Sequence, residues 1–365
     1  SSLPLIQSPP MTDDDFMRRA LALAEQGRYS TSPNPMVGCV IVRDGVVIAE
    51  GWHRRAGEAH AEVDALRQCG DPRGTTMYVT LEPCCHQGRT GPCAEAIIEA
   101  GVARVVVAML DPHEVVDGGG IARLDAAGID VTTGVLEAEA RRLNEIFVWS
   151  VTQKLPFVVL KAGMTLDGKL ATVTRDSQWI TGEEARERGL VLREEMDAIL
   201  VGSGTIREDD PRLTRRLGLA SGITPWTRVV LDGDGELPPH AQVLRDGRTI
   251  VFTSRPERYD AHPDLELVPT DGRVDLEQVL AELHARGIRS VLAEGGAVIH
   301  AELIRRALWQ KMLLFIAPMI IGGAEAPSIF SGEGVAKLTD AYRFRFDRVE
   351  RVGADLMVTA YPSSL

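Results

Sequence analysis

The sequence lacks the features expected of a protein that binds polymeric nucleic acid or a membrane. Acidic residues outnumber basic ones, 52 to 40, and the resulting net charge of -12 has the wrong sign for gripping phosphate backbones. Aromatic residues make up only 5% of the chain, too few for an extended base-stacking surface. The longest apolar stretch, residues 312–321, contains Pro318 and is much shorter than the roughly 18 residues of a membrane span. We therefore expect no nucleic-acid partner and no membrane partner.

Cysteine is scarce, and its arrangement does not suit a disulfide framework. There are five cysteines, an odd number, and three of them, Cys84, Cys85 and Cys93, fall within ten residues. This clustering favours reduced thiols that can bind a metal. The first ten residues lack the basic start and apolar centre of a secretion signal, and Met11 is expected to be the natural start. These features predict a cytoplasmic protein.

Length and apolar patterning predict two α/β domains. A chain of 365 residues with 44% hydrophobic and 25% charged residues suits two globular domains. Helical segments alternate with apolar strands in both halves, and the pattern is interrupted at 152–156, so we place the domains at residues 11–152 and 153–365. The predicted strands cover 37–42, 46–49, 77–81 and 105–110 in the first half, and 157–161, 198–201, 229–232, 249–253, 291–293 and 312–316 in the second. The main predicted helices cover 12–27, 94–100, 136–149, 183–195, 276–286 and 298–306.

One constellation in the first half points to a metal. His60-Ala61-Glu62, followed by Cys84 and Cys93, supplies an imidazole, two thiolates and a carboxylate that is not needed as a ligand. A catalytic zinc has three protein ligands and keeps its fourth position for water, and Glu62 would then serve as general acid and base. The order of these residues is that of the zinc nucleobase deaminases, although eight residues rather than two separate the cysteines.

This interpretation leaves alternatives open. Cys85 and His86 lie between the two cysteines and are rival ligands, and buried cysteines alone are common in protein cores. Two residues of one helix that are two positions apart point about 200° away from each other. His60 and Glu62 therefore face one metal only if a helix starts after His60.

The second half carries weaker signals. Residues 201–205 follow a predicted strand but lack the third glycine of a dinucleotide-binding fingerprint. The turn Glu294-Gly295-Gly296 precedes a helical pattern and could receive a phosphate on its N–H groups, or it is only a tight turn. A group of arginines suits phosphate binding, or forms a solvated face paired with Asp209 and Asp210. These arginines are Arg193, Arg207, Arg212, Arg215 and Arg216.

The motifs of the first half, residues 33–40, 60–62 and 78–93, resemble the deaminase half of the bifunctional riboflavin biosynthesis family RibD. In that family a long loop separates the two cysteines. The resemblance implies a cytidine-deaminase-like α/β sandwich. It also implies zinc ligands at His60, Cys84 and Cys93, a proton shuttle at Glu62, and a pyrimidine contact from Asn34.

The motifs of the second half, residues 161–169, 177–181, 204–214 and 294–296, are similar to the reductase half of the same family, whose α/β fold is like dihydrofolate reductase. The resemblance implies NADPH contacts from Gly163, Trp179, Thr205, Asp209 and Gly296. It implies substrate contacts from Ser177, Arg193, Leu213, Arg216 and Glu294.

The resemblance predicts a two-step activity on a small molecule. The first domain would hydrolytically deaminate 2,5-diamino-6-(5-phosphoribosylamino)pyrimidin-4(3H)-one with zinc, and the second would reduce the ribosyl group to a ribityl group with NADPH. We also expect a homo-oligomer. Two other hypotheses stay open: a monofunctional zinc deaminase of nucleobases or nucleosides with a regulatory C-terminal domain, and a structural zinc module attached to a ligand-binding domain.

Overall fold

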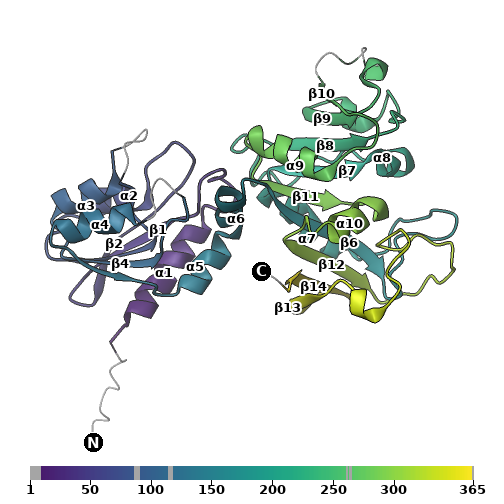
Figure 1. The fold of residues 1–365 in the computed structure, drawn as a ribbon. Helices are drawn as coiled ribbons and strands as arrows, with labels where there is room; N and C mark the ends of the chain where they lie inside the picture. The colour runs from purple at the N-terminus through teal and green to yellow at the C-terminus, as the bar shows by residue number, and fades with distance from the viewer. Residues whose placement is uncertain (1–9, 86–90, 114–117, 260–261, 263–264, 364–365) are drawn as a thin grey trace, which may run out of the picture. The chain divides into compact units, whose positions relative to one another are not determined.

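The computed structural model describes residues 10–85, 91–113, 118–259, 262 and 265–363. The chain divides into two compact units, at Gln153 and Lys154. Both contain a sheet and helices (Figure 1), so the α/β class predicted for each half is confirmed. In the described part of the chain, no helix is long and apolar enough to cross a lipid bilayer.

The first unit is built on a five-stranded sheet in the order β2-β1-β3-β4-β5. Its central strands β3 and β4 are parallel and buried almost along their whole length, because helices cover both faces. Helices α1 and α5 cover one face, and α2, α3 and α4 lie together on the other (Figure 1). The strands are β1 (Gly38–Arg43), β2 (Val46–Trp52), β3 (Thr76–Leu81), β4 (Arg104–Met109) and β5 (Asp130–Thr133), and the helices are α1 (Asp13–Glu25), α2 (Ala61–Gln68), α3 (Cys93–Ala100), α4 (Gly119–Ala126), α5 (Glu137–Leu143) and α6 (Glu145–Gln153).

Local sequence signals explain several of these boundaries. Thr12 caps α1, and its side chain and that of Asp15 form a reciprocal capping box. Asp44 and Gly45 both have positive φ angles, 51° and 76°, as a tight hairpin between β1 and β2 requires. The expected single helix at 136–149 is instead two helices. Asn144 lies between them. Its side-chain oxygen accepts a hydrogen bond from the Met36 backbone N–H, and its side-chain nitrogen donates to the Met36 carbonyl oxygen, both at 2.8 Å.

The second unit contains a nine-stranded sheet in the order β10-β9-β8-β7-β11-β6-β12-β14-β13. The first seven strands in this order are parallel, and an antiparallel hairpin ends the sheet. The strands are β6 (Phe157–Thr165), β7 (Ala198–Gly202), β8 (Thr227–Asp232), β9 (Arg248–Thr253), β10 (Glu266–Pro269), β11 (Ser290–Glu294), β12 (Lys311–Ala317), β13 (Phe344–Val352) and β14 (Asp355–Pro362). The helices are α7 (Glu183–Glu195), α8 (Ser203–Asp209), α9 (Leu276–Ala285) and α10 (Ala297–Arg305).

All six strands expected in this half are present, and three further strands were missed. Short β10 lies at one edge of the sheet, while β13 and β14 form the other end. Most of β13 is exposed and carries alternating charged residues, so it lacks the apolar run by which the buried strands were found. The order of strands brings the carboxyl ends of β7, β11 and β6 side by side.

Candidate active sites

The backbone at His60 resolves the geometric problem that the sequence raised. His60 is the N-cap of α2 and has extended backbone, with φ of -71° and ψ of 161°. Because His60 precedes the helix, its side chain does not follow the helical rotation that would separate it from Glu62. Cys93 is the first residue of α3, which packs beside α2. Two helix starts thus bring the predicted ligands together.

The three predicted ligands form one compact group. The His60 Nδ1 atom lies 3.2 Å from the Cys93 Sγ atom and 3.6 Å from the Cys84 Sγ atom, and all three ligand atoms lie within 4.8 Å of one another. Ordinary zinc bond lengths in a tetrahedron put nitrogen and sulfur ligands about 3.6 Å apart. The donor set therefore fits a zinc ion in both chemistry and spacing.

One of the two rival ligands, Cys85, stands apart from this group. The Cys85 thiol lies against α4, since a Cβ atom placed on Gly119 would come within 2.8 Å of its sulfur. Among the residues that the structure describes, the metal-binding group contains His60, Cys84 and Cys93 but not Cys85. His86 lies outside the described residues.

Burial and hydrogen bonding shift the pKa values in this group. Burial raises the pKa of the Glu62 carboxyl to about 7, although the nearby His60 opposes the shift. Hydrogen bonds from the Cys93 thiol and from His60 lower the pKa of the Cys84 thiol, and the Cys93 backbone N–H also donates to its sulfur at 3.3 Å. Glu62 can therefore exchange a proton near neutral pH, and Cys84 favours the thiolate that binds metal.

A cavity of about 330 Å³ opens beside the three ligands, within the size range of small-molecule sites. Sequence reasoning assigned Asn34 a contact here but gave no binding role to most of the other lining residues, among them Asp111, His113 and Phe147. Asp111 and His113 follow the carboxyl end of β4, the position where parallel sheets bind ligands, and that signal could have identified them. The lining residues are Asn34, Pro35, Val37, His53, His60, Glu62, Leu81, Glu82, Cys84, Asp111, His113 and Phe147.

Glu82 holds one wall of this cavity in place. Its buried carboxylate accepts four backbone hydrogen bonds, from Asp111 and Gly118 on one oxygen and from Gly120 and Ile121 on the other, at 2.9–3.2 Å. These bonds tie the end of β3 to the segment that follows β4 and to the start of α4. Glu82 therefore positions the segment that carries two of the lining residues.

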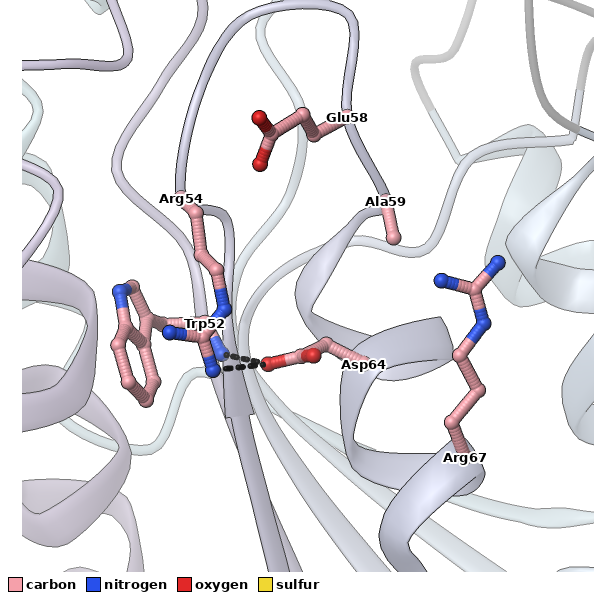
Figure 2. Close-up of a pocket in the computed structure, with 6 residues that line it drawn as sticks. All are labelled: Trp52, Arg54, Glu58, Ala59, Asp64 and Arg67. Atoms are coloured by element: carbon pink, nitrogen blue, oxygen red, sulfur yellow. Dashed lines mark hydrogen bonds and ion pairs between the residues drawn. The ribbon is translucent and has the colours of Figure 1, made fainter.

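A second hollow, of about 410 Å³, lies where β2 ends and α2 passes (Figure 2). In it the Asp64 carboxylate accepts hydrogen bonds from the Trp52 backbone N–H and from the Arg54 guanidinium, both at 3.3 Å. The Arg54 guanidinium also lies over the Trp52 ring, 3.6 Å from its centroid. These contacts fasten the start of the loop that runs from β2 to His60 against α2.

In the second unit, five of the ten predicted reductase residues lie near the carboxyl ends of three neighbouring strands. Arg193 from α7 makes a two-pronged ion pair with Glu294 at the end of β11, with distances of 3.0 and 2.8 Å. The Lys161 Nζ atom of β6 lies 3.9 Å from the same carboxylate. Burial disfavours the charged form of Glu294, but Lys161 and Arg193 outweigh it and lower its pKa to about 2. Lys161 had no predicted role, and only the strand order reveals it.

The glycine turn after β11 meets the start of α8. Gly295 and Gly296 have φ angles of 85° and 87°, a conformation that other residues rarely adopt. A Cβ atom on Gly295 would lie 3.3 Å from the Thr205 hydroxyl oxygen. Gly163 lies nearby in β6, the strand next to β11. Gly163, Thr205 and Gly296, three of the residues predicted to bind the cofactor, thus lie together near the carboxyl ends of the strands.

The remaining predicted residues are placed as follows. The Ser177 hydroxyl donates to the Asp209 carboxylate at 3.4 Å, so these two residues lie together. The Trp179 side chain is 66% exposed and lies under the Arg186 guanidinium. Leu213 is buried with a positive φ angle of 52°, and Arg216 is exposed.

The arginine group of the sequence is not one phosphate-binding surface. Arg207 pairs with Glu236, and Arg212 pairs with Asp246. Arg215 donates to the backbone carbonyls of Arg193 and Thr224 at 2.9 and 3.0 Å. The solvated-face interpretation also named the wrong partners, since Asp209 accepts from Ser177 and Asp210 from Gln242. Of the same group, Arg193 pairs with Glu294, and the Arg216 side chain is exposed.

Comparison with known families divides the chain in the same way. Residues 10–109 match the cytidine and deoxycytidylate deaminase zinc-binding region, and residues 156–358 match the RibD C-terminal domain. The riboflavin biosynthesis protein RibD of Bacillus amyloliquefaciens is 40% identical over 359 residues, covering 96% of each chain. RibD of Escherichia coli strain K12 is 40% identical over 361 residues, covering 95% of this chain and 98% of its own.

Solved structures agree with these relatives over the whole chain. Acinetobacter baumannii RibD superposes with a TM-score of 0.88 at 36% identity, covering 96% of this chain and 99% of its own. A Thermotoga maritima protein described as a diaminohydroxyphosphoribosylaminopyrimidine deaminase and 5-amino-6-(5-phosphoribosylamino)uracil reductase has a TM-score of 0.88 at 38% identity, covering 96% and 98%.

Proposed function

Because this chain belongs to the RibD family of bifunctional deaminase and reductase enzymes of riboflavin biosynthesis, we propose that residues 11–152 carry its deaminase site and residues 153–365 its reductase site. The substrates would be those in the description of the Thermotoga maritima relative: a diaminopyrimidine carrying a phosphoribosylamino group, and the aminouracil formed from it. The observation that carries the deaminase proposal is the group of His60, Cys84 and Cys93 beside buried Glu62.

His60, Cys84 and Cys93 would hold the zinc ion of the deaminase. Zinc bound there would activate a water molecule for attack on the pyrimidine carbon that carries the amino group. Glu62 would accept a proton from the attacking water and deliver it to the amino nitrogen, so that the C–N bond breaks, a C=O bond forms and ammonia leaves.

The reductase half uses a nicotinamide cofactor, which we propose is NADPH. The Gly295-Gly296 turn and the first N–H groups of α10 would receive a phosphate of the cofactor, with Thr205 and Gly163 beside them, while Trp179 and Asp209 would contribute further contacts. Ser177, Leu213, Glu294 and the two arginines, Arg193 and Arg216, would bind the phosphoribosyl substrate. The cofactor supplies the hydride, and these residues position the ring and the ribosyl carbon for transfer.

We also propose that the enzyme works as a homo-oligomer in the cytoplasm. Strand β13 is the edge of its sheet and exposes apolar side chains, including Phe346, which is 68% exposed, and Val349. An exposed apolar edge strand has unpaired backbone N–H and C=O groups, which can form hydrogen bonds with a strand of another chain. All five cysteines are unpaired in the structure, which suits a reducing compartment. Sedimentation of the wild-type chain and of Phe346→Glu would test the assembly.

Replacing Glu62 tests the assignment of the deaminase site. Glu62→Gln keeps the size of the side chain and removes its proton transfer. We expect ammonia release to fall by about 100-fold or more, with one zinc ion still bound per chain. NADPH oxidation with the deaminated substrate should be unchanged, which shows that the second unit is intact, while the retained zinc shows that the first unit is folded. Full ammonia release with normal zinc content would refute the assigned role.

The family matches do not favour a monofunctional deaminase, since the reductase domain matches over residues 156–358. A purely structural zinc module is also disfavoured, because the described residues supply three protein ligands beside an open cavity.

A further inference from the structure

The deaminase cavity contains a histidine whose hydrogen bonds fix the orientation of its neighbour. The His53 side chain is buried, only 2% exposed, at the end of β2. Its Nδ1 atom lies 3.0 Å from the backbone carbonyl oxygen of Ala59, and its Nε2 atom lies 3.1 Å from the Asn34 Nδ2 atom. A carbonyl oxygen has no proton to donate, so the Nδ1 atom carries the hydrogen.

The other ring nitrogen is then an acceptor. The Asn34 atom that lies 3.1 Å from Nε2 is the side-chain amide nitrogen, which donates hydrogen bonds and does not accept them. Nε2 therefore holds the lone pair that accepts this bond. The side-chain oxygen of Asn34 is left as the amide atom available to a ring bound in the cavity that Asn34 lines.

The surrounding structure keeps this chain of hydrogen bonds in place. The Asn34 backbone N–H donates to Thr31, and Asn144 bonds both backbone groups of Met36, so the segment carrying Asn34 is anchored on both sides. The loop between His53 and Ala59 is fastened at its start by the contacts of Trp52, Arg54 and Asp64 (Figure 2). His53 therefore meets both partners in fixed positions.

We propose that His53 is a positioning residue that fixes Asn34 as a hydrogen-bond acceptor, so that the site selects pyrimidines with a ring N–H next to the amino-bearing carbon. The inference rests on the proposed deaminase function. In a 2-aminopyrimidin-4(3H)-one, one of the two ring nitrogens beside the amino-bearing carbon carries a hydrogen, whose bond the Asn34 oxygen can accept. In cytosine the nitrogen at that position is a bare acceptor, and two acceptors repel each other.

A double-mutant cycle tests whether His53 acts through Asn34. We expect Asn34→Ala and His53→Phe each to raise the KM of deamination about 10- to 100-fold, with a smaller change in kcat, because the ring N–H is present before and after the reaction. The double variant should be no worse than the worse single variant. The inference would be overturned if the increase in KM of the double variant equalled the product of the two single increases, or if the variants lowered only kcat.

Three controls keep this test decisive. His53→Gln places an amide oxygen where it can accept from Asn34, and it should restore most of the lost affinity. Zinc content and NADPH-dependent reductase activity report whether each variant is folded, and His240→Phe makes the same substitution at an exposed histidine outside the first unit. No release of ammonia by the unsubstituted enzyme would refute the proposed function itself, whereas multiplying effects in an active enzyme refute only the role of His53.

Inhibition by free bases gives a second readout. Isocytosine has a tautomer with the ring N–H, and cytosine has the bare nitrogen. We expect isocytosine to inhibit the unsubstituted enzyme more strongly than cytosine, and this preference to disappear in both Asn34→Ala and His53→Phe. A preference that persists in either variant would contradict the proposal.

Discussion

Replacing Glu82 by glutamine should loosen one wall of the deaminase cavity. The Glu82 carboxylate accepts four backbone hydrogen bonds, two on each oxygen. Glutamine keeps one oxygen and turns the other into an NH2 group, which faces two N–H donors that it cannot satisfy. Each bond to a charged acceptor contributes about 1.5–3 kcal/mol, so losing one pair costs about 3–6 kcal/mol of local stability.

Hydrogen exchange measures this loss at the amides concerned. Since about 1.4 kcal/mol is a tenfold change in an equilibrium constant, exchange of the Gly120 and Ile121 amides, or of the Asp111 and Gly118 amides, should accelerate at least about 100-fold. Deamination should weaken as well, because Asp111 lines the cavity, while the reductase activity is unaffected.

A matched control separates this effect from the loss of a negative charge. Glu95 is partly exposed and pairs with Arg123 on the surface of the same unit. Glu95→Gln should change exchange at the four amides by less than about fivefold, because surface ion pairs contribute about 1 kcal/mol or less. Unchanged exchange at all four amides in Glu82→Gln would refute the positioning role.

Two further predictions concern the metal group and the reductase site. Cys84→Ser should lose most of the bound zinc and the ammonia release, whereas Cys85→Ser should keep both. Equal zinc loss in the two variants would show that Cys85 is a ligand. Glu294, with its pKa lowered from 4.5 to about 2, should contribute up to about 3 kcal/mol of stability that is fully present above about pH 4.5 and is lost as the pH falls toward 2. In Glu294→Gln, the free energy of unfolding of the second unit should therefore fall less steeply as the pH is lowered over this range. An unaltered dependence on pH would contradict the buried ion network.

Most of the fold was predictable from local patterns. The buried parallel strands are continuous apolar runs, so their positions in both halves were found from the sequence. The capping box at Thr12 and the Asp44-Gly45 hairpin follow from local backbone chemistry. The edge strand β13 was missed because it is mostly exposed and has no apolar run, whereas β14, which lies between β12 and β13, was missed although most of it is buried. The domain limits at 152 and 153 and the roles of the individual site residues remain predictions.

The sequence by itself determined which chemistry the chain can perform. The donor set that specifies a zinc deaminase consists of a histidine, two cysteines and a free carboxylate, at His60, Cys84, Cys93 and Glu62. The motifs around these residues identified the family correctly. These features are read from residue types and spacing within short segments, which the sequence displays directly.

Only the tertiary structure decided how these groups are arranged. It placed His60 just before a helix, set Lys161 beside Glu294, gave Glu82 its four backbone donors, and made His53 the link between Ala59 and Asn34. It also showed that Arg207, Arg212 and Arg215 bind protein groups rather than form one anion surface. Each of these outcomes depends on contacts between segments far apart in the chain, and such contacts are set by strand order and packing rather than by local sequence.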